Sequence, residues 1–322
     1  MEKFNPSFIL SNRHIQTIYS TFFREISPLD IQKEIFELED GDFIEPYWYN
    51  KPKVTTSKPI VILLHGLEGS YQSPYIKGMM LALDKVDISS IIVHFRGCGD
   101  KPNRLARAYH SGDTADIQAY IKYLHKKFPL NPLYAIGYSM GGNVLLKLLG
   151  EDGNHCLLKK AISVSAPMQL DISAKTINQG FSKIYQNHLL KNLKKDLLAK
   201  YKKHPLEKLI GLKKSQINDI KTIWEFDELY TSKIHHFKTA QNYYKLSSAK
   251  QYLKNITIPT LIIHALDDPF MSKDILPSKD ELSSSITLEV SRHGGHVGFI
   301  GGGIFNPIYW LENRIVNYIL DK

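Results

Sequence analysis

The residues best suited to chemistry surround Ser139. The stretch 137–143 reads Gly-Tyr-Ser-Met-Gly-Gly-Asn, between the apolar run 133–136 and the helical pattern 144–149. In such a Gly-x-Ser-x-Gly turn the serine hydroxyl is exposed, because only small residues fit beside so tight a bend. The first N–H groups of the following helix point at the same place. An ordinary glycine-rich turn is the alternative, but the flanking strand and helix favour a nucleophile.

A serine nucleophile needs a base that takes its proton, and the base needs an acid that orients it. Candidate acids follow the apolar run 260–263, in the sequence His-Ala-Leu-Asp-Asp-Pro-Phe. Loops at the carboxyl ends of parallel strands commonly carry the chemistry of such folds. Asp267 and Asp268 are neighbours, so at most one is expected to face the base. We predict Asp268, because it lies just before a turn; the alternative is that both are turn residues next to proline.

The candidate base follows the strand-like run 286–290, in the sequence Ser-Arg-His-Gly-Gly-His-Val-Gly-Phe. Two glycines precede His296 and allow this loop to fold back over the sheet. His293 is the competitor, but it lies nearer the strand end and before the glycine pair. We predict His296 as the general base, which gives the chain order serine, acid, histidine.

The negative charge that develops on a substrate carbonyl oxygen needs hydrogen-bond donors. The N–H of Met140, the residue after the serine, is one candidate. The loop after the apolar run 60–64 contains two glycines and can approach a ligand closely. We predict the N–H of Leu67 as the second donor, with His65 as a brace for the loop and Glu68 exposed.

Strand and helix patterns alternate along most of the chain, and residues 31–50 read as a β-hairpin. Further strands are expected at 91–93 and 161–164, and helices are expected from Ser73-Pro74, from an N-cap at Asp113 and from Asn306-Pro307. Such alternation predicts an α/β fold with a mostly parallel central sheet and helices on both of its faces.

The alternation stops between residues 171 and 253, where amphipathic helical patches replace it. One patch contains five leucines between Leu189 and Leu198, with lysines on its other face. Because the segment lies after the serine turn and between two core strands, we predict a helical cap over the active site. The predicted organisation is a core of residues 1–170 and 254–322 and a cap of residues 171–253. A basic amphipathic helix on a membrane surface is the alternative.

The composition excludes several classes of protein. The chain has 322 residues, of which 43% are hydrophobic, so it is not disordered. It contains no run of about 18 apolar residues, and residues 1–20 lack the apolar centre of a signal peptide. Its two cysteines suit a reducing cytosol, so we predict a cytoplasmic location. The net charge of +9 comes without any nucleic-acid-binding signature, and no nucleic-acid partner is expected.

No cofactor and no metal ion are predicted. His235 and His236 are adjacent and would point apart on a helix, which makes a poor ligand pair. The three glycines at 301–303 lack the strand-loop-helix context of a dinucleotide site and read as a loop.

Several longer motifs resemble a known family, the YheT-like branch of the α/β-hydrolases, also called the AB hydrolase 4 family. The resemblance extends over nearly the whole chain. It is carried by Asn12–Thr17, His65–Gly69, Phe95–Cys98, Tyr109–Gly112, Gly137–Asn143, Phe226–Asp227, Asp267–Phe270 and Gly294–Phe299. It implies the α/β-hydrolase fold with Ser139 as nucleophile, Asp268 as acid and His296 as base, as chosen above. For Arg96, His110 and Ser111 we favour roles in loop architecture over direct catalysis.

We therefore predict a serine hydrolase that cleaves carboxylic esters of short- to medium-chain acyl groups through an acyl-enzyme. An acyltransferase with the same triad is the first alternative, and a non-catalytic binding protein on a hydrolase scaffold is the second. The expected partner is a small-molecule ester or a lipid-like substrate. No stable membrane insertion is expected, although weak association with an anionic membrane surface is compatible with the positive charge.

Overall fold

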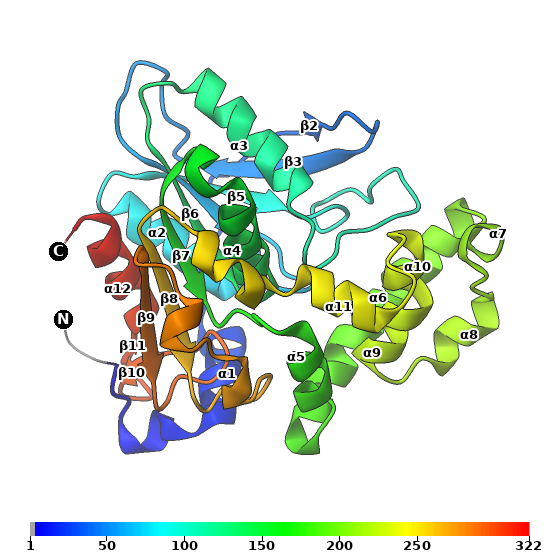
Figure 1. The fold of residues 1–322 in the computed structure, drawn as a ribbon. Helices are drawn as coiled ribbons and strands as arrows, with labels where there is room; N and C mark the ends of the chain where they lie inside the picture. Colours follow the sequence, from blue (N-terminus) through cyan, green and yellow to red (C-terminus); the bar gives the residue numbers. More distant parts are fainter. Residues whose placement is uncertain (1–3, 322) are drawn as a thin grey trace.

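A nine-stranded sheet forms the centre of the computed structural model, which describes residues 4–321 (Figure 1). The strand order is β1-β3-β5-β4-β6-β7-β8-β9, and β2 pairs with β3 beside this path. The strands are β1 (Gln32–Lys33), β2 (Phe36–Glu37), β3 (Phe43–Tyr49), β4 (Ile60–Leu64), β5 (Ser89–His94), β6 (Leu133–Tyr138), β7 (Leu158–Val164), β8 (Thr260–Ala265) and β9 (Ile286–Ser291). β3 runs antiparallel to β5, and the strands from β5 to β9 are parallel. The carboxyl ends of the parallel strands therefore share one edge of the sheet.

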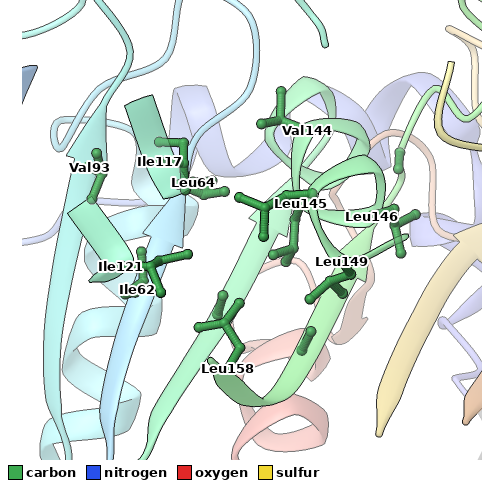
Figure 2. Packing of buried hydrophobic residues seen from close by; sticks show 14 of the residues in the cluster. Ile62, Leu64, Val93, Ile117, Ile121, Val144, Leu145, Leu146, Leu149 and Leu158 are labelled. Atoms are coloured by element: carbon green, nitrogen blue, oxygen red, sulfur yellow. The ribbon is translucent and has the colours of Figure 1, made fainter. Parts of the chain in front are cut away.

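Helices cover both faces of this sheet, as the alternating pattern predicts. They include α2 (Pro74–Asp84) and α12 (Trp310–Ile319) on one face, and α3 (Ala115–Lys127) and α4 (Met140–Asp152) on the other. The side chains of β4 alternate between the two cores, because successive residues of a strand point to opposite faces. Ile62 and Leu64 lie in the core beneath α3 and α4, where Figure 2 shows them with Leu145 of α4. Leu63 lies in the core on the other face of the sheet, beneath α2 and α12.

Between β7 and β8 the chain forms only helices within the described residues; we call residues 165–259 the helical segment. Its α-helices are α5 (Leu170–Ile177), α6 (Lys183–Lys203), α7 (Leu206–Ile210), α8 (Lys214–Asp219), α9 (Ile223–Phe226), α10 (Ser232–Ile234) and α11 (Ala240–Ser247). The other helical elements of this segment are η3 (Gly180–Ser182), the π-helix η4 (Asp227–Thr231) and η5 (Ala249–Asn255). Figure 1 shows α6 to α10 beside the sheet, connected to it through α5 and α11.

The remaining elements lie outside this sheet and the helical segment. They are η1 (Phe8–Ser11), α1 (Arg13–Phe23), η2 (Gly153–His155), η6 (Lys273–Ile275), η7 (Lys279–Glu281), β10 (Ile300–Gly302) and β11 (Pro307–Tyr309). Over residues 4–321, every helix is too short or too polar to cross a lipid bilayer.

The expected strands of the central sheet are confirmed, whereas two helix starts differ from the expectation. The hairpin at 31–50 is confirmed by the antiparallel pair of β2 and β3. The helix expected after Asp113 begins at Ala115 with Thr114 at its N-cap, and Asp113 instead accepts from Arg107 at 3.4 Å.

The last helix was expected to begin at Asn306-Pro307, but it begins at Trp310. Residues 307–309 form β11, which pairs with β10 in an antiparallel two-stranded sheet. The interpretation of the three glycines as a loop is wrong for the same reason, because Gly301 and Gly302 belong to β10. Backbone pairing between two short segments leaves little trace in the pattern of apolar residues.

Arg96, for which the sequence favoured a role in loop architecture, is a structural residue of the loop after β5. Its guanidinium is buried and donates to Asp116 at 2.5 and 2.6 Å, and to Asp40 and Asp42 at 2.8 and 3.1 Å. A buried cation of this kind requires such pairing, since an uncompensated charge is very costly inside a protein. Arg96 thereby joins the hairpin, the loop after β5 and α3.

Candidate active site

Ser139 occupies the sharp turn between β6 and α4. Its backbone has φ 52° and ψ −122°, a conformation that residues other than glycine rarely adopt. The flanking glycines are required by contact. A Cβ atom on Gly137 would lie 2.4 Å from the Gly141 carbonyl oxygen, and one on Gly141 would lie 2.5 Å from the His65 carbonyl oxygen. The turn therefore places the serine at the carboxyl edge of the sheet with no room for larger neighbours.

The structure brings the three predicted side chains together from three separate loops. His296 Nε2 lies 2.8 Å from Ser139 Oγ, and His296 Nδ1 lies 2.8 Å from Asp268 Oδ2. An ionised carboxylate only accepts hydrogen bonds, so the imidazole carries its hydrogen on Nδ1 and accepts the serine proton at Nε2. This geometry is that of a nucleophile, its base and the acid that orients the base.

Asp268 is held at both carboxylate oxygens. The side chain is buried, with Oδ1 accepting from the Phe270 N–H at 2.8 Å and Oδ2 facing His296. The Phe270 ring stacks flat on the imidazole, with centroids 4.0 Å apart and planes 9° apart. A stacked aromatic ring restricts rotation of the imidazole and excludes water from one of its faces.

The two competitors pair with each other instead. Asp267 Oδ2 lies 3.4 Å from His293 Nδ1, and Asp267 Oδ1 accepts from the Gly295 N–H at 2.9 Å. Asp267 is thus a loop-building residue beside the Asp268–His296 pair.

The loop after β4 lies directly against the serine. A Cβ atom on Gly66 would be 3.1 Å from Ser139 Cβ, and Leu67 and Met140 line the same cavity as Ser139. Among the hydrogen bonds of the described chain, neither the Leu67 nor the Met140 N–H donates to a protein acceptor. The two predicted donors are therefore available to a ligand, and their role stays a prediction.

His65 braces this loop, as expected from the sequence. Its Nε2 accepts from the Phe95 N–H at 3.2 Å, so its Nδ1 carries the hydrogen and donates to the Gly66 carbonyl at 2.7 Å. Burial and, to a lesser extent, the neighbouring His94 lower the pKa of His65 to about 3. His65 is thus neutral and structural.

Glu68 differs from the expectation of an exposed side chain. It is half-buried, accepts from the Tyr109 hydroxyl at 2.8 Å and lines both cavities described below. Burial raises the pKa of its carboxyl to about 7. Asp196 of α6, from a distant part of the sequence, lies beside this carboxyl.

Two cavities lie next to each other, and Ser139 lines the larger one. The larger has a volume of about 720 Å³ and is lined by Ser139, His296 and apolar side chains of α1, α5 and α6. The smaller has a volume of about 190 Å³ and contains His110 and Tyr230. The two cavities share six lining residues, which are Leu67, Glu68, Ser111, Met140, Ile223 and Asp227. The smaller cavity therefore adjoins the cavity of the nucleophile through these six residues.

No group of three or more histidine, cysteine, aspartate or glutamate side chains with metal-binding geometry occurs within residues 4–321. The pair His235-His236 was expected on a helix, but His235 is the C-cap that follows α10 and His236 has φ 62°. His235 instead contacts the His110 ring, with centroids 4.5 Å apart.

Comparisons with known proteins agree with this fold. The sequence model of the alpha/beta hydrolase fold family matches residues 59–302. The chain is 40% identical, over 98% of its length, to the protein named "Putative esterase YheT" of Escherichia coli (strain K12), of which it covers 93%. It is 31% identical, over 81% of its length, to the monoacylglycerol lipase of Saccharomyces cerevisiae, of which it covers 60%. The fold is similar to that of the Pyrococcus furiosus esterase Pf2001, with a TM-score of 0.60, 16% identity, and 100% and 98% of the two chains covered.

The chain therefore belongs to the α/β-hydrolase family, within the branch that contains YheT. The resemblance seen in the sequence motifs is confirmed, together with the mostly parallel sheet that it implied.

Several residues of the site were not predicted from the sequence. Phe270 appeared only as part of a motif, and no sequence signal indicates that its ring stacks on His296. Arg13 and Thr17 of α1 contact the loops of Asp268 and His296, although more than 250 residues separate them in the chain. The motif that contains both residues was the only available signal.

The buried histidines predict how stability depends on pH. Burial lowers the pKa of His65 to about 3 and that of His94 to about 4, against about 6.5 in the unfolded chain. Their stabilising contribution is therefore complete above pH 6.5 and is lost as the pH falls, by about 1.4 kcal/mol per pH unit for each histidine. We expect the free energy of unfolding, measured by urea titration, to decrease steadily between pH 6.5 and pH 5.

The matched variants are His94→Gln and His125→Gln. The first removes a buried histidine and should reduce the slope, whereas the second removes an exposed one and should leave the slope unchanged. The same slope in His94→Gln as in the wild type would contradict the assignment of a neutral, buried His94.

Proposed function

We propose that this protein is a serine hydrolase that cleaves carboxylic esters of short- to medium-chain acyl groups. The observation that carries the proposal is the hydrogen-bond chain from Ser139 through His296 to Asp268, which opens into a largely apolar cavity. Two relatives, YheT and the yeast lipase, carry the names of ester-cleaving enzymes, which supports the same reaction class.

In the proposed first step, Ser139 Oγ attacks the ester carbonyl carbon while His296 Nε2 takes the serine proton. The carbonyl oxygen becomes negatively charged, and the N–H groups of Leu67 and Met140 stabilise it. Collapse of this intermediate breaks the bond to the alcohol, which leaves with the proton from His296. Asp268 keeps the imidazole in the required tautomer and stabilises its charged form.

In the proposed second step, water attacks the acyl group on Ser139. His296 takes a proton from the water, and the acid product leaves as the serine regains its proton. The enzyme returns to its starting state with one ester bond broken and one water consumed.

We further propose that residues 171–253 act as a cap on a core formed by residues 1–170 and 254–322. Support comes from side chains of α5 and α6, including Ala174, Ile177 and Leu189, which line the larger cavity. An acyl chain placed there would be removed from water, which favours apolar substrates.

We also propose a cytoplasmic location. Both cysteines carry free thiols, which supports this location.

Replacing Ser139 with alanine tests the proposal directly. Turnover of p-nitrophenyl esters should fall by about four orders of magnitude or more, because the nucleophile is lost while the binding groups remain. A panel of esters with increasing acyl length, assayed on the wild type, reports the chain length that the cavity accepts. Circular dichroism of the variant provides the folding control. Ester turnover that survives in folded Ser139→Ala protein would exclude the mechanism.

Acyl transfer is the second candidate function. The smaller cavity shares Leu67 and Met140 with the cavity that Ser139 lines, which leaves room for an alcohol beside the acyl group. The first step would be the same, and an alcohol would replace water in the second. Product analysis with added ethanol separates the two reactions, because only a transferase forms the ethyl ester as the main product.

We also propose weak association with an anionic membrane surface. Four large apolar side chains close to the mouth of the larger cavity are exposed: Phe22, Phe23, Phe181 and Ile184, at 71%, 69%, 56% and 57%. Three of them line that cavity, and the exposed Lys183 lies between Phe181 and Ile184 in the chain. Exposed aromatic groups beside positive charges favour binding to negatively charged lipid headgroups.

Sedimentation with lipid vesicles tests this association. The protein should bind vesicles that contain phosphatidylglycerol more strongly than pure phosphatidylcholine vesicles, and added salt should weaken the binding. The double variant Phe22→Ser/Phe181→Ser should bind less than the wild type. Leu130→Ser, which removes a 59% exposed leucine at the opposite edge of the sheet, is the control and should not change the binding. Equal binding to both kinds of vesicle would contradict the proposal.

A further inference from the structure

The helix α1 contacts both loops that carry the partners of Ser139. Arg13 Nη2 donates to the Asp268 carbonyl oxygen at 3.0 Å, and the His296 N–H donates to Thr17 Oγ1 at 3.0 Å. This helix lies outside the stretch 59–302 that matches the α/β-hydrolase family. One helix from the start of the chain thus joins the backbone of the acid to the backbone of the base.

The Thr17 hydroxyl is oriented by a second hydrogen bond. It donates to the Arg13 carbonyl oxygen at 2.8 Å, one turn earlier in α1. Because its single hydrogen is used there, the oxygen lone pairs face the His296 N–H. A hydroxyl that donates and accepts at once is also a stronger acceptor than an isolated one. The position of the His296 backbone is therefore defined by α1.

Gln16 fixes the end of the same loop. Its buried side chain donates to the Ile300 carbonyl oxygen at 2.8 Å and accepts from the Ile300 N–H at 2.7 Å. A side-chain amide that pairs with both the N–H and the carbonyl of one residue takes the place of the backbone hydrogen bonds that a neighbouring strand would make. The loop from His296 to Ile300 is thereby held at both ends.

The loop backbone also lies in direct contact with α1. A Cβ atom on Gly295 would lie 2.6 Å from the Arg13 carbonyl oxygen, and one on Gly298 would lie 2.3 Å from the Gln16 carbonyl oxygen. Such distances leave no space for a side chain, so both glycines are required by this packing. The contact explains the glycines on both sides of His296 without invoking loop mobility.

We propose that Arg13 and Thr17 are positioning residues, which set the geometry of Asp268 and His296 relative to Ser139. They act through the acid and the base and do not themselves exchange a proton with the substrate. The proposal rests on the proposed serine-hydrolase function. It differs from a purely structural role for α1, because it ties the rate of the reaction to two individual contacts.

The test is the variant Thr17→Val, which keeps the side-chain shape and removes the acceptor. The kcat for a p-nitrophenyl ester should fall by about 10- to 100-fold, since small misplacements of catalytic groups have effects of that size. The KM should change much less than kcat. The rate at which a fluorophosphonate probe labels Ser139 should fall in parallel, and Thr17→Ser should restore both rates.

Thr176→Val is the matched control. The Thr176 hydroxyl makes the same bond one turn back in α5, to the Ile172 carbonyl oxygen at 2.8 Å, but accepts from no loop N–H among the described residues. Both valine variants should therefore lower the Tm, Thr17→Val by more because it also leaves the His296 N–H unpaired, and only Thr17→Val should lower kcat. If Thr17→Val does not fold, Arg13→Met serves as the second variant, with the same expected loss in kcat and partial rescue by Arg13→Lys.

Three outcomes overturn the proposal: unchanged kcat in Thr17→Val, an equal loss of kcat in Thr176→Val, or no rescue by Thr17→Ser. Failure of the proposed function itself is separable from these outcomes. In that case the probe would fail to label the wild type, or would label Ser139→Ala equally well.

Discussion

A chain of two hydrogen bonds, each 2.8 Å long, organises the functional part of this molecule. It joins groups that follow β6, β8 and β9, so the sheet must place the ends of all three strands within reach of one imidazole. The end of β7 completes this arrangement. The Ser139 N–H donates to the Val164 carbonyl, and Ser165 Oγ accepts from the Val297 N–H at 3.2 Å. Removing one partner would leave a buried polar group without a hydrogen bond, which is costly in free energy.

The same site stores backbone strain. Ser139, Ser165 and Val297 all have positive φ angles, between 50° and 60°, and all three lie at the carboxyl edge of the sheet. Such conformations cost of the order of 1 kcal/mol or more each and persist only when the surrounding structure imposes them. Here the parallel strands and the close glycine contacts impose them. As a consequence, the serine hydroxyl is exposed to a cavity and is hydrogen-bonded to its base before any ligand binds.

Much of this architecture could be predicted from the sequence because the signals are local. Apolar runs such as 60–64 mark buried strands, and the serine turn needs its glycines for steric reasons that can be read without coordinates. The choice of Asp268 and His296 relied on their places after strands. Contacts between distant segments were not predictable in this way. The exposure of Glu68 depends on α6, the start of the last helix depends on pairing with β10, and the support of His296 by Thr17 spans 279 residues. Nothing in a local pattern specifies these partners.

The most direct test of this account is a crystal structure of the protein after reaction with a fluorophosphonate ester. The account predicts a phosphorus atom bonded to Ser139 Oγ and one phosphonyl oxygen within about 3 Å of the Leu67 and Met140 nitrogens. His296 should remain hydrogen-bonded to Asp268. Phosphorus on any other residue, or a phosphonyl oxygen directed away from both N–H groups, would contradict the account.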